Sequence, residues 1–256
     1  MLCVKRYAMV VAMVISGLGF AAQPASAGPF SLTFGGQTIS GDTESAVTFW
    51  SVATIAGGAD QLSAEVYYLQ LGGGALTPIS PEAWRIQGAT LSVGYNTDGF
   101  GSCTTENFSG CEVTIQHTLS PIGTSWSTTF GFQNLSNFSI YTYSDYDLSG
   151  SLSGDTGSYV GTGRFLQSDE LTSLVWQINQ NLAAFDVFPC CGVPLPLQNR
   201  PSASGDVAFA TQVSNPQALG MSIDRALSPV PEPMSMMLLG SGLAGLAARR
   251  RFTRKA

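Results

Sequence analysis

Charged side chains are scarce in this chain of 256 residues, where they make up 11% of the sequence. Globular proteins usually contain about a quarter of charged residues. The polar surface must therefore come largely from serine, threonine and asparagine, and 29 glycines add to this uncharged composition. Such a composition favours a secreted β protein over a cytosolic enzyme.

Positive charge is nearly absent from the middle of the chain. Seven of the 11 lysines and arginines lie in the first six or the last eight residues, and the other four are Arg85, Arg164, Arg200 and Arg225. With four basic and 16 acidic residues, this middle part carries a net charge of −12. It would repel the phosphates of a nucleic acid, so nucleic acid is not a predicted partner, and cations are favoured over anions.

Catalytic motifs are also lacking. His117 is the one histidine, which excludes a metal site with two histidine ligands. It lies between Ile115 and Leu119 on the apolar side of a predicted strand, and we interpret it as a histidine of the core or of a strand edge rather than a general base. One histidine is enough for a Ser-His-Asp triad, but no G-x-S-x-G motif marks a nucleophile. We therefore assign no catalytic residue and predict a protein that is not an enzyme.

The five cysteines do not form the C-x-x-C spacing of zinc or thioredoxin chemistry. Cys103 and Cys111 are close enough in sequence to close a small loop, and we predict a disulfide between them. Cys190 and Cys191 are adjacent. Because a bond between neighbours is strained, a vicinal disulfide, two thiols and pairing elsewhere all stay open.

The first 27 residues have the three parts of a secretory signal peptide. A basic start with Lys5 and Arg6 precedes an apolar run at residues 7–22, and Ala25 and Ala27 form the small-x-small pattern of a cleavage site. We predict that signal peptidase cleaves after Ala27 and that the protein is exported across the inner membrane. The alternative is an uncleaved membrane anchor, for which the apolar run is short.

The last 28 residues, 229–256, also have three parts. Pro231, Glu232 and Pro233 form a rigid, extended segment, because each proline fixes its own φ and restrains its neighbour. Residues 234–248 are apolar or small and would form a transmembrane helix about 22 Å long, short for a bilayer core of about 30 Å. The basic end at residues 249–255 should stay in the cytoplasm by the positive-inside rule, which leaves the large domain outside.

This order of motif, helix and basic end closely resembles the PEP-CTERM sorting signal. The resemblance implies recognition and processing by an exosortase in a Gram-negative bacterium that makes exopolysaccharide. Pro231, Glu232 and Pro233 would then be a substrate motif, and the helix would hold the protein in the membrane before processing. The implied destination is the cell surface, the outer envelope or the extracellular matrix. The alternative is an ordinary C-terminal anchor with a proline-rich stem.

Between the two ends, at residues 28–228, apolar and polar residues alternate with the period of a strand that has one buried face. We predict a single all-β domain, an antiparallel β-sandwich or jelly roll, flanked by the signal-peptide helix and the C-terminal helix. Residues 168–181 fit a helix or a strand, and residues 190–196 a loop. The predicted strands lie at residues 47–55, 62–71, 91–95, 111–119, 126–132, 138–143, 159–167 and 207–213.

The candidate binding residues lie on one predicted strand and just beyond it. Tyr141, Tyr143 and Asp145 alternate, so on a regular strand they point away from Phe138 and Ile140. Exposed rings beside carboxylates would stack on sugars. The alternative is that both tyrosines cover a second core face of the sandwich. The segment also resembles the Phe/Tyr-rich strand and Asp-x-Asp-Leu of other PEP-CTERM proteins, a resemblance that implies no activity.

Asp145 and Asp147 also begin a segment with oxygen-bearing side chains at alternate positions and glycine in sixth place, as in a calcium loop. Thr156 stands where an acid is expected in twelfth place, and Asp155 comes one residue early, so a solvated acidic turn is the alternative. Calcium is the one candidate cofactor, and no metal ligand is assigned. Two carboxylates are also what a glycosidase needs, but nothing in the sequence places these two on either side of a sugar.

These observations predict an exported, non-enzymatic protein with a structural or exopolysaccharide-associated role. A carbohydrate-binding module for exopolysaccharide, using Tyr141 and Tyr143, is the main alternative. A secreted glycoside hydrolase is a more remote one.

Overall fold

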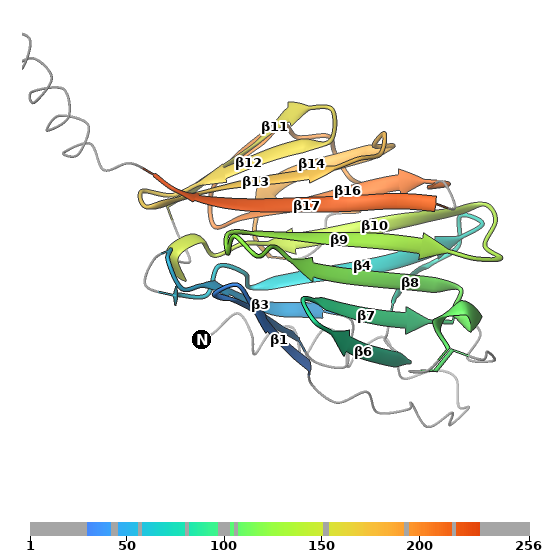
Figure 1. Ribbon diagram of the computed structural model, residues 1–256. Coiled ribbons are helices and arrows are strands. Elements are labelled where there is room, and N and C mark those ends of the chain that lie inside the picture. Colours follow the sequence, from blue (N-terminus) through green and yellow to red (C-terminus); the bar gives the residue numbers. More distant parts are fainter. Residues whose placement is uncertain are drawn as a thin grey trace, which may run out of the picture.

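The computed structural model describes residues 30–41, 46–55, 58–79, 82–96, 103–104, 107–150, 154–191, 195–216 and 219–230. Within these ranges the chain forms 17 strands, all paired antiparallel, in two sheets (Figure 1). The sheets pack face to face as a sandwich, with the nine-stranded sheet in front of the eight-stranded sheet in this view. The predicted all-β sandwich is therefore confirmed.

The eight-stranded sheet has the order β1-β2-β3-β4-β10-β16-β14, with β5 paired to β4. Strands distant in sequence are therefore neighbours at its centre. Its strands are β1 (Phe30–Phe34), β2 (Gln37–Gly41), β3 (Ala46–Val52), β4 (Ala64–Leu71), β5 (Leu76–Pro78), β10 (Phe138–Asp145), β14 (Ala184–Pro189) and β16 (Val207–Ser214).

The nine-stranded sheet has the order β15-β11-β12-β13-β17-β9-β8-β7-β6. Its last strand in sequence, β17, lies in the middle of the sheet. Its strands are β6 (Ala83–Gln87), β7 (Thr90–Tyr95), β8 (Val113–Leu119), β9 (Ser125–Phe132), β11 (Asp155–Gly161), β12 (Arg164–Ser168), β13 (Thr172–Ile178), β15 (Ser202–Gly205) and β17 (Leu219–Pro229). Two short 3-10 turns, η2 (Phe108–Gly110) and η3 (Leu148–Gly150), complete the described elements.

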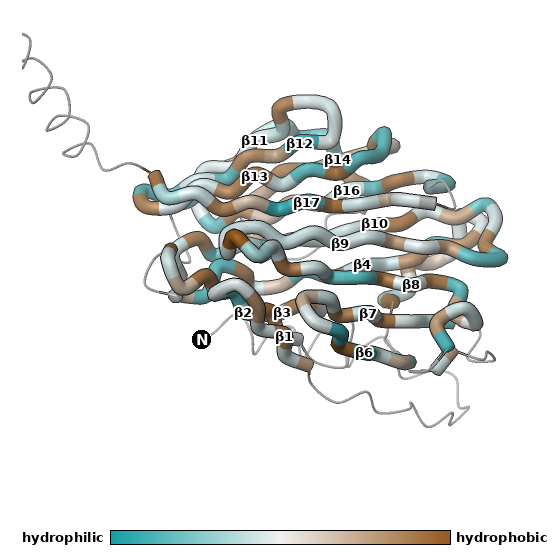
Figure 2. The backbone as a smooth tube through the Cα atoms, in the orientation of Figure 1, coloured by the Kyte–Doolittle hydropathy of each residue, from teal (hydrophilic) through white to brown (hydrophobic). Residues whose placement is uncertain are grey.

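The core between the sheets is rich in aromatic rings. Figure 2 shows hydrophobic residues interspersed with polar ones along the strands, as expected of strands with one face in the core between two sheets. Trp50 of β3 and Trp126 of β9 meet edge to face at 5.6 Å between ring centroids and so join the two sheets. Burial of each large apolar side chain contributes about 1.5–3 kcal/mol, so contacts of this kind hold the sheets together.

A buried ion pair also crosses the core. Glu65 of β4 and Arg225 of β17 have no exposed side-chain surface. Arg225 Nε donates a hydrogen bond of 2.7 Å to Glu65 Oε2, and its Nη2 donates to Glu65 Oε1. The guanidinium lies 4.1 Å from the centroid of the Trp126 ring, and the Tyr146 hydroxyl donates to Glu65 Oε2 at 2.8 Å. The pair could not be predicted from the sequence, because its partners are 160 positions apart.

One predicted strand is wrong. Residues 159–167 form the end of β11, a turn and most of β12 rather than a single strand. The turn falls at Gly161, Thr162 and Gly163, which all have positive φ, and the two glycines allow this at no steric cost. Residues 168–181, left open as helix or strand, contain the strand β13, which pairs with β12 and β17.

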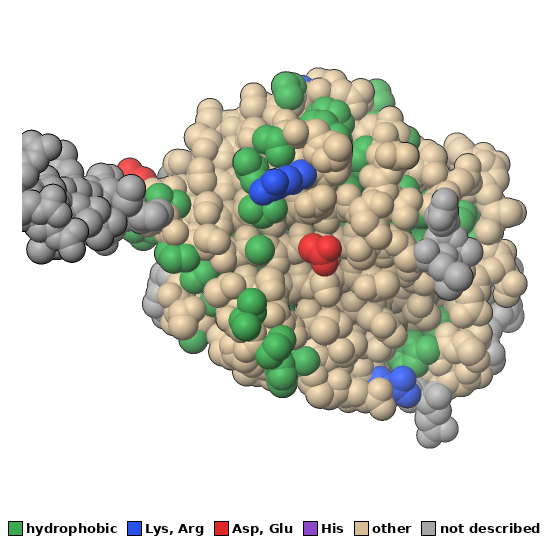
Figure 3. Space-filling model, turned by 45° about the horizontal axis from the view of Figure 1, so that its top comes forward, with side chains coloured by type: hydrophobic (Ala, Val, Ile, Leu, Met, Phe, Trp, Pro, Cys, Tyr) green, Lys and Arg blue, Asp and Glu red, His purple; other side chains and the backbone are tan. Residues whose placement is uncertain are grey.

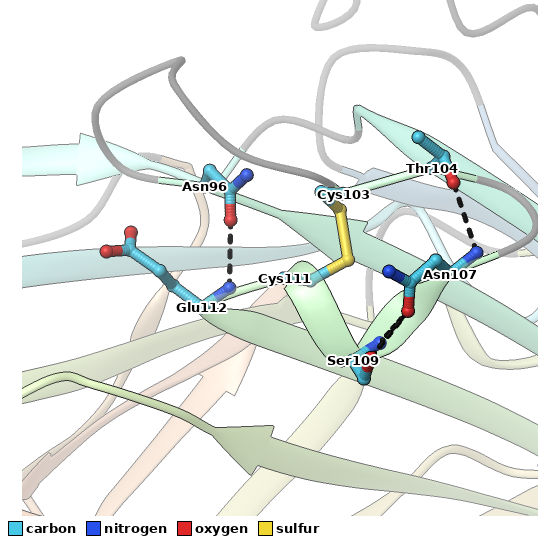
Figure 4. Close-up of a disulfide and its surroundings, with 7 residues drawn as sticks. All are labelled: Asn96, Cys103, Thr104, Asn107, Ser109, Cys111 and Glu112. Atoms are coloured by element: carbon cyan, nitrogen blue, oxygen red, sulfur yellow. Dashed lines mark hydrogen bonds between the residues drawn. A yellow bond between two sulfur atoms is a disulfide. The ribbon is translucent and has the colours of Figure 1, made fainter.

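The predicted disulfide between Cys103 and Cys111 is confirmed, with an S–S distance of 2.15 Å (Figure 4). It fastens the loop before η2 to the start of β8. Asn107 caps η2 by accepting from Ser109 N, and Asn96 accepts from Glu112 N beside the bond.

Several predictions concern residues outside the described ranges. Among the residues that are described, no helix has the length and apolar character needed to cross a bilayer. The predictions outside these ranges are the signal peptide at 1–27 with Ala25 and Ala27, the motif Pro231, Glu232 and Pro233, the helix at 234–248 and the basic end at 249–255.

Candidate functional site

Strand β10 presents its candidate residues on the outer face of the eight-stranded sheet, as predicted. Phe138 and Ile140 point into the main core, whereas Tyr143 belongs to a second apolar cluster with Phe188 on the other face. Tyr141 is 8% exposed and Tyr143 is 3% exposed, so the rings are buried rather than displayed. Both rings are thus covered, that of Tyr143 within the second apolar cluster, and their contact with sugar stays a prediction.

The hydroxyl groups of both tyrosines are used. Tyr141 donates to Gln70 Oε1 at 3.2 Å, and Tyr143 donates to Asp145 Oδ2 at 3.2 Å. The Tyr143 hydroxyl therefore connects the second apolar cluster to the acidic end of β10.

Three carboxylates converge where β10 ends. Asp145 is the last residue of β10, Asp147 follows two residues later, and Asp206 lies between β15 and β16. Because β16 pairs with β10 and places Ala208 opposite Asp145, Asp206 reaches the same corner of the sandwich. One oxygen atom of each carboxylate lies within 4.8 Å of the other two. We call these three residues the carboxylate cluster.

The three side chains of the carboxylate cluster are poorly solvated, and their negative charges repel one another. Burial, followed by the charges of Asp206 and Asp147, raises the pKa of Asp145 to about 8. Burial, followed by the charges of Asp206 and Asp155, raises the pKa of Asp147 to about 7. The pKa of Asp206 is raised by burial as well. Burial thus disfavours the charged form of all three carboxylates, and repulsion from neighbouring carboxylates adds to this effect at Asp145 and Asp147.

A vicinal disulfide between Cys190 and Cys191 borders the carboxylate cluster, which decides among the three states left open by the sequence. Cys190 Sγ lies 3.0 Å from Asp145 Oδ2. A disulfide sulfur carries no proton and so donates no hydrogen bond to this oxygen. Cys190 N donates to the backbone oxygen of Asp206 at 2.7 Å, which fixes the disulfide against the same corner.

The segment that begins at Asp145 and resembles a calcium loop does not fold as a calcium loop. Ser149, in the middle of η3, has a φ of 57°, and its N–H donates to Gln61 Oε1 at 3.0 Å. Asp155 and Thr156 already belong to β11, where Thr156 pairs with Ser168. The third carboxylate of the cluster is Asp206, which we did not predict as a site residue. Its position between Gly205 and the apolar strand β16 is a weak signal in the sequence.

The other outer face, on the nine-stranded sheet, is nearly uncharged (Figure 3). Thr118, Ser127, Asp224, Gln177 and Arg164 lie side by side across β8, β9, β17, β13 and β12. A shallow groove of about 440 Å³ crosses this row. Its exposed lining consists of hydroxyl, amide and small apolar groups around a single carboxylate, a composition that suits a neutral polar ligand.

His117 is buried in the core at 3% exposure, in agreement with its interpretation as a core histidine. Its Nδ1 lies 3.0 Å from Thr128 Oγ1. Burial and the charge of Arg225 lower its pKa to about 3, so the ring is neutral at physiological pH and does not reach solvent as a general base would.

Comparison with known families identifies a motif at the C-terminal end of the chain. Residues 229–251 match the family model of the PEP-CTERM protein-sorting motif. The chain carries a PEP-CTERM sorting motif. Pro229, the first residue of the PEP-CTERM match, is also the last residue of β17, so the sorting motif continues directly from the sandwich. No curated protein matches the chain.

The PEP-CTERM motif is attached to a sandwich with known structural relatives. The chain is similar to a bacterial glucoamylase complexed with acarbose, at 10% identity and a TM-score of 0.58, over 85% of this chain and 34% of that one. It is also similar to a family GH92 inverting mannosidase from Bacteroides thetaiotaomicron, at 9% identity and a TM-score of 0.49, over 82% of this chain and 29% of that one. The chain thus spans about a third of either enzyme, and the likeness to the glucoamylase shows the fold alone.

Proposed function

We propose that this chain is a non-enzymatic protein of the cell surface or extracellular matrix of a Gram-negative bacterium, with a structural or exopolysaccharide-associated role. The PEP-CTERM motif at residues 229–251 carries the proposal. This motif supports sorting by an exosortase. The predicted signal peptide at residues 1–27 would supply the export step that such sorting requires.

The join between fold and motif supports this proposal. Pro229 pairs with Thr172 of β13, and Val230 N donates to the backbone oxygen of Leu171 at 2.8 Å. The motif therefore begins at a strand in the middle of the nine-stranded sheet. A processing enzyme that recognises Pro231, Glu232 and Pro233 would work within a few residues of the folded sandwich.

The geometry of the carboxylate cluster supports a non-enzymatic role. The two acids of a glycosidase stand roughly 5–10 Å apart on either side of the bond that they cleave. One oxygen each of Asp145, Asp147 and Asp206 lies within 4.8 Å of the other two, and Asp145 is 2% exposed. Buried carboxylates this close together are poorly placed to flank a glycosidic bond. The likeness to a glucoamylase domain therefore does not lead us to propose hydrolysis.

Replacement of Pro231, Glu232 and Pro233 together by alanine tests the sorting proposal. We expect the wild-type protein in the outer envelope or the medium of its native host. The variant should stay in the inner-membrane fraction at its unprocessed size. Asp224→Ala, an exposed change on the sandwich, is the matched control and should distribute like wild type. Equal distribution of wild type and triple variant would contradict the proposal.

The groove on the nine-stranded sheet favours a second candidate, a carbohydrate-binding module for the host's exopolysaccharide. Hydroxyl and amide groups such as Thr118, Ser127 and Gln177 can hydrogen-bond sugar hydroxyls without the cost of burying charge. We expect Gln177→Ala to weaken binding to purified exopolysaccharide by about tenfold, the equivalent of about 1.4 kcal/mol. Thr77→Ala, exposed on β5, should leave it unchanged. Absence of binding by the wild type would remove this candidate.

The same assay tests the tyrosines. Tyr141→Phe and Tyr143→Phe keep the buried rings and remove only the hydroxyl groups. Loss of binding in these variants, with Gln177→Ala intact, would move the sugar site from the groove to the outer face of the eight-stranded sheet.

A further inference from the structure

The carboxylate cluster holds buried oxygen atoms that the protein itself leaves without a partner. Asp145 is 2% exposed, and its Oδ1 has no hydrogen-bond partner among the described residues. Asp206 Oδ1 is buried and unpartnered in the same way. Native proteins pair most of their buried polar atoms, and a bound ion or an ordered water is a common partner for atoms left in this state. These two atoms belong to carboxylates that converge within 4.8 Å, together with Asp147.

No basic side chain of the described residues neutralises the carboxylate cluster. Arg200 pairs with Asp186, and Arg225 pairs with Glu65 in the core. Arg85 lies over the Phe108 ring at 5.1 Å, and Arg164 is exposed on the nine-stranded sheet. The described ranges contain no lysine, and the charges that act on Asp145 come from Asp206, Asp147 and Asp155, all negative. Buried carboxylates without a paired charge are costly unless a cation compensates them.

We infer that Asp145, Asp147 and Asp206 form a binding site for a hard divalent cation, with calcium as the ion that suits it best. Carboxylate oxygens are the ligands that calcium and magnesium prefer. Calcium accepts irregular coordination by six to eight oxygens, which suits ligands from a strand end, a loop and a crossing between sheets. The adjacent sulfurs are held in the Cys190–Cys191 disulfide, so the oxygens define the site and soft metals are disfavoured.

The site has a structural consequence that does not depend on sorting. Asp145 ends β10 of the eight-stranded sheet, and Asp206 lies where the chain crosses from β15 of the nine-stranded sheet to β16, which pairs with β10. A cation held between them would fasten this crossing between the sheets to the end of β10. Because it binds the folded state, it would raise the melting temperature as its concentration rises.

The test is calorimetric titration and thermal melting of the purified full-length chain with calcium, magnesium and manganese, after treatment with a chelator. The pH is about 8.5, above the raised pKa values of Asp145 and Asp147. We expect calcium to bind with a dissociation constant of about 0.1–1 mM, typical of extracellular modules, and to raise the melting temperature. Terbium should replace calcium and emit on excitation of tyrosine, since the Tyr143 hydroxyl lies 3.2 Å from Asp145 Oδ2.

Asp206→Asn separates ligation from a merely structural role. It should lower calcium affinity at least tenfold and, because it removes repulsion, melt at a higher temperature than wild type in chelator. Asp147→Asn should behave likewise and serves if Asp206→Asn does not fold, while Asp224→Asn, exposed on the nine-stranded sheet, should match wild type throughout. Absence of any heat or melting shift with all three ions up to about 10 mM would overturn the inference, as would wild-type affinity in both cluster variants.

Discussion

At the scale of single residues, Glu65 and Arg225 show how a charged pair can be kept in the core of a sandwich. Arg225 also donates to Thr128 Oγ1 at 2.9 Å and to the backbone oxygen of Ile223 at 3.0 Å. Ser144 and Tyr146 donate to Glu65. The pair is therefore surrounded by partners, and loss of either member would leave the other charged and buried.

We expect Glu65→Gln to destabilise the fold by about 3–5 kcal/mol, because Arg225 would remain as an uncompensated buried charge. Chemical denaturation monitored by tryptophan fluorescence measures this. The double variant Glu65→Met with Arg225→Met should lose less stability than the sum of the losses in Glu65→Met alone and Arg225→Met alone, since the double variant leaves no charge unpaired. Additive losses in this cycle would show that the two residues do not depend on each other.

His117 gives a pH dependence of known sign. Burial and Arg225 lower its pKa in the folded state to about 3, while an unfolded histidine titrates near pH 6.5. The unfolded state therefore binds more protons between these values, and stability is lost as the pH falls from about 6.5 towards 3.

The variant His117→Asn keeps a side-chain group near Thr128 but cannot titrate. Between pH 7 and pH 4.5, we expect wild type to lose about 2–3 kcal/mol more than this variant, since each pKa unit is worth about 1.4 kcal/mol. Groups other than His117 titrate alike in both proteins and cancel in the difference. Parallel pH profiles would mean that His117 is solvated or protonated in the folded state.

At the scale of the element, the Cys103–Cys111 disulfide depends on a glycine in the neighbouring strand. A Cβ atom on Gly94 of β7 would lie 2.4 Å from Cys111 Sγ and 2.7 Å from Cys103 Sγ. The absence of a side chain at Gly94 therefore lets the disulfide pack on the sheet. The sequence predicts the disulfide from spacing but gives no sign of this contact.

Gly94→Ala should destabilise the protein by about 1–3 kcal/mol through overpacking against the sulfurs. In a Cys103→Ala, Cys111→Ala background the same change should cost less, because the clashing atoms are gone. That background alone should lose about 2–3 kcal/mol from the small loop that it opens. Thermal melting of the four proteins completes the cycle. An equal cost of Gly94→Ala in both backgrounds would refute the packing argument.

Element prediction succeeded where one face of a strand is buried and failed where a turn interrupts an apolar run. Residues 111–119 alternate without interruption and contain β8. Residues 159–167 keep the alternation across a turn, so only the two glycines at 161 and 163 mark the break between β11 and β12. The order of strands could not be predicted, because β10 pairs with β4 and β16 through contacts between distant segments.

The candidate site was predictable in part for the same reason. The strand period placed Tyr141, Tyr143 and Asp145 on one face, and the structure agrees. The sequence left exposure and burial of the two rings as alternatives, because the choice depends on residues from distant segments such as Phe188 of β14 and Leu197, which pack in the cluster with Tyr143. Asp206 could not be joined to Asp145 either, because pairing of β16 with β10 brings them together.

At the scale of the whole molecule, the sandwich is followed directly by the sorting motif. β17 lies in the middle of the nine-stranded sheet and ends at Pro229, where the PEP-CTERM match begins. The described residues thus provide a folded cargo with a low-charge outer face and an acidic corner. In the proposed function, the two ends of the chain direct export and sorting, and the sandwich acts at the cell surface or in the matrix.

Intact-mass spectrometry of the mature protein from its native host can detect both the predicted export and the predicted sorting. We expect a protein that begins at Gly28, after loss of the signal peptide, and that lacks residues 234–256, the helix and basic end of the sorting signal. We also expect to recover it from the envelope or the medium. A protein that retains residues 234–256 and is recovered from the cell interior would contradict the account.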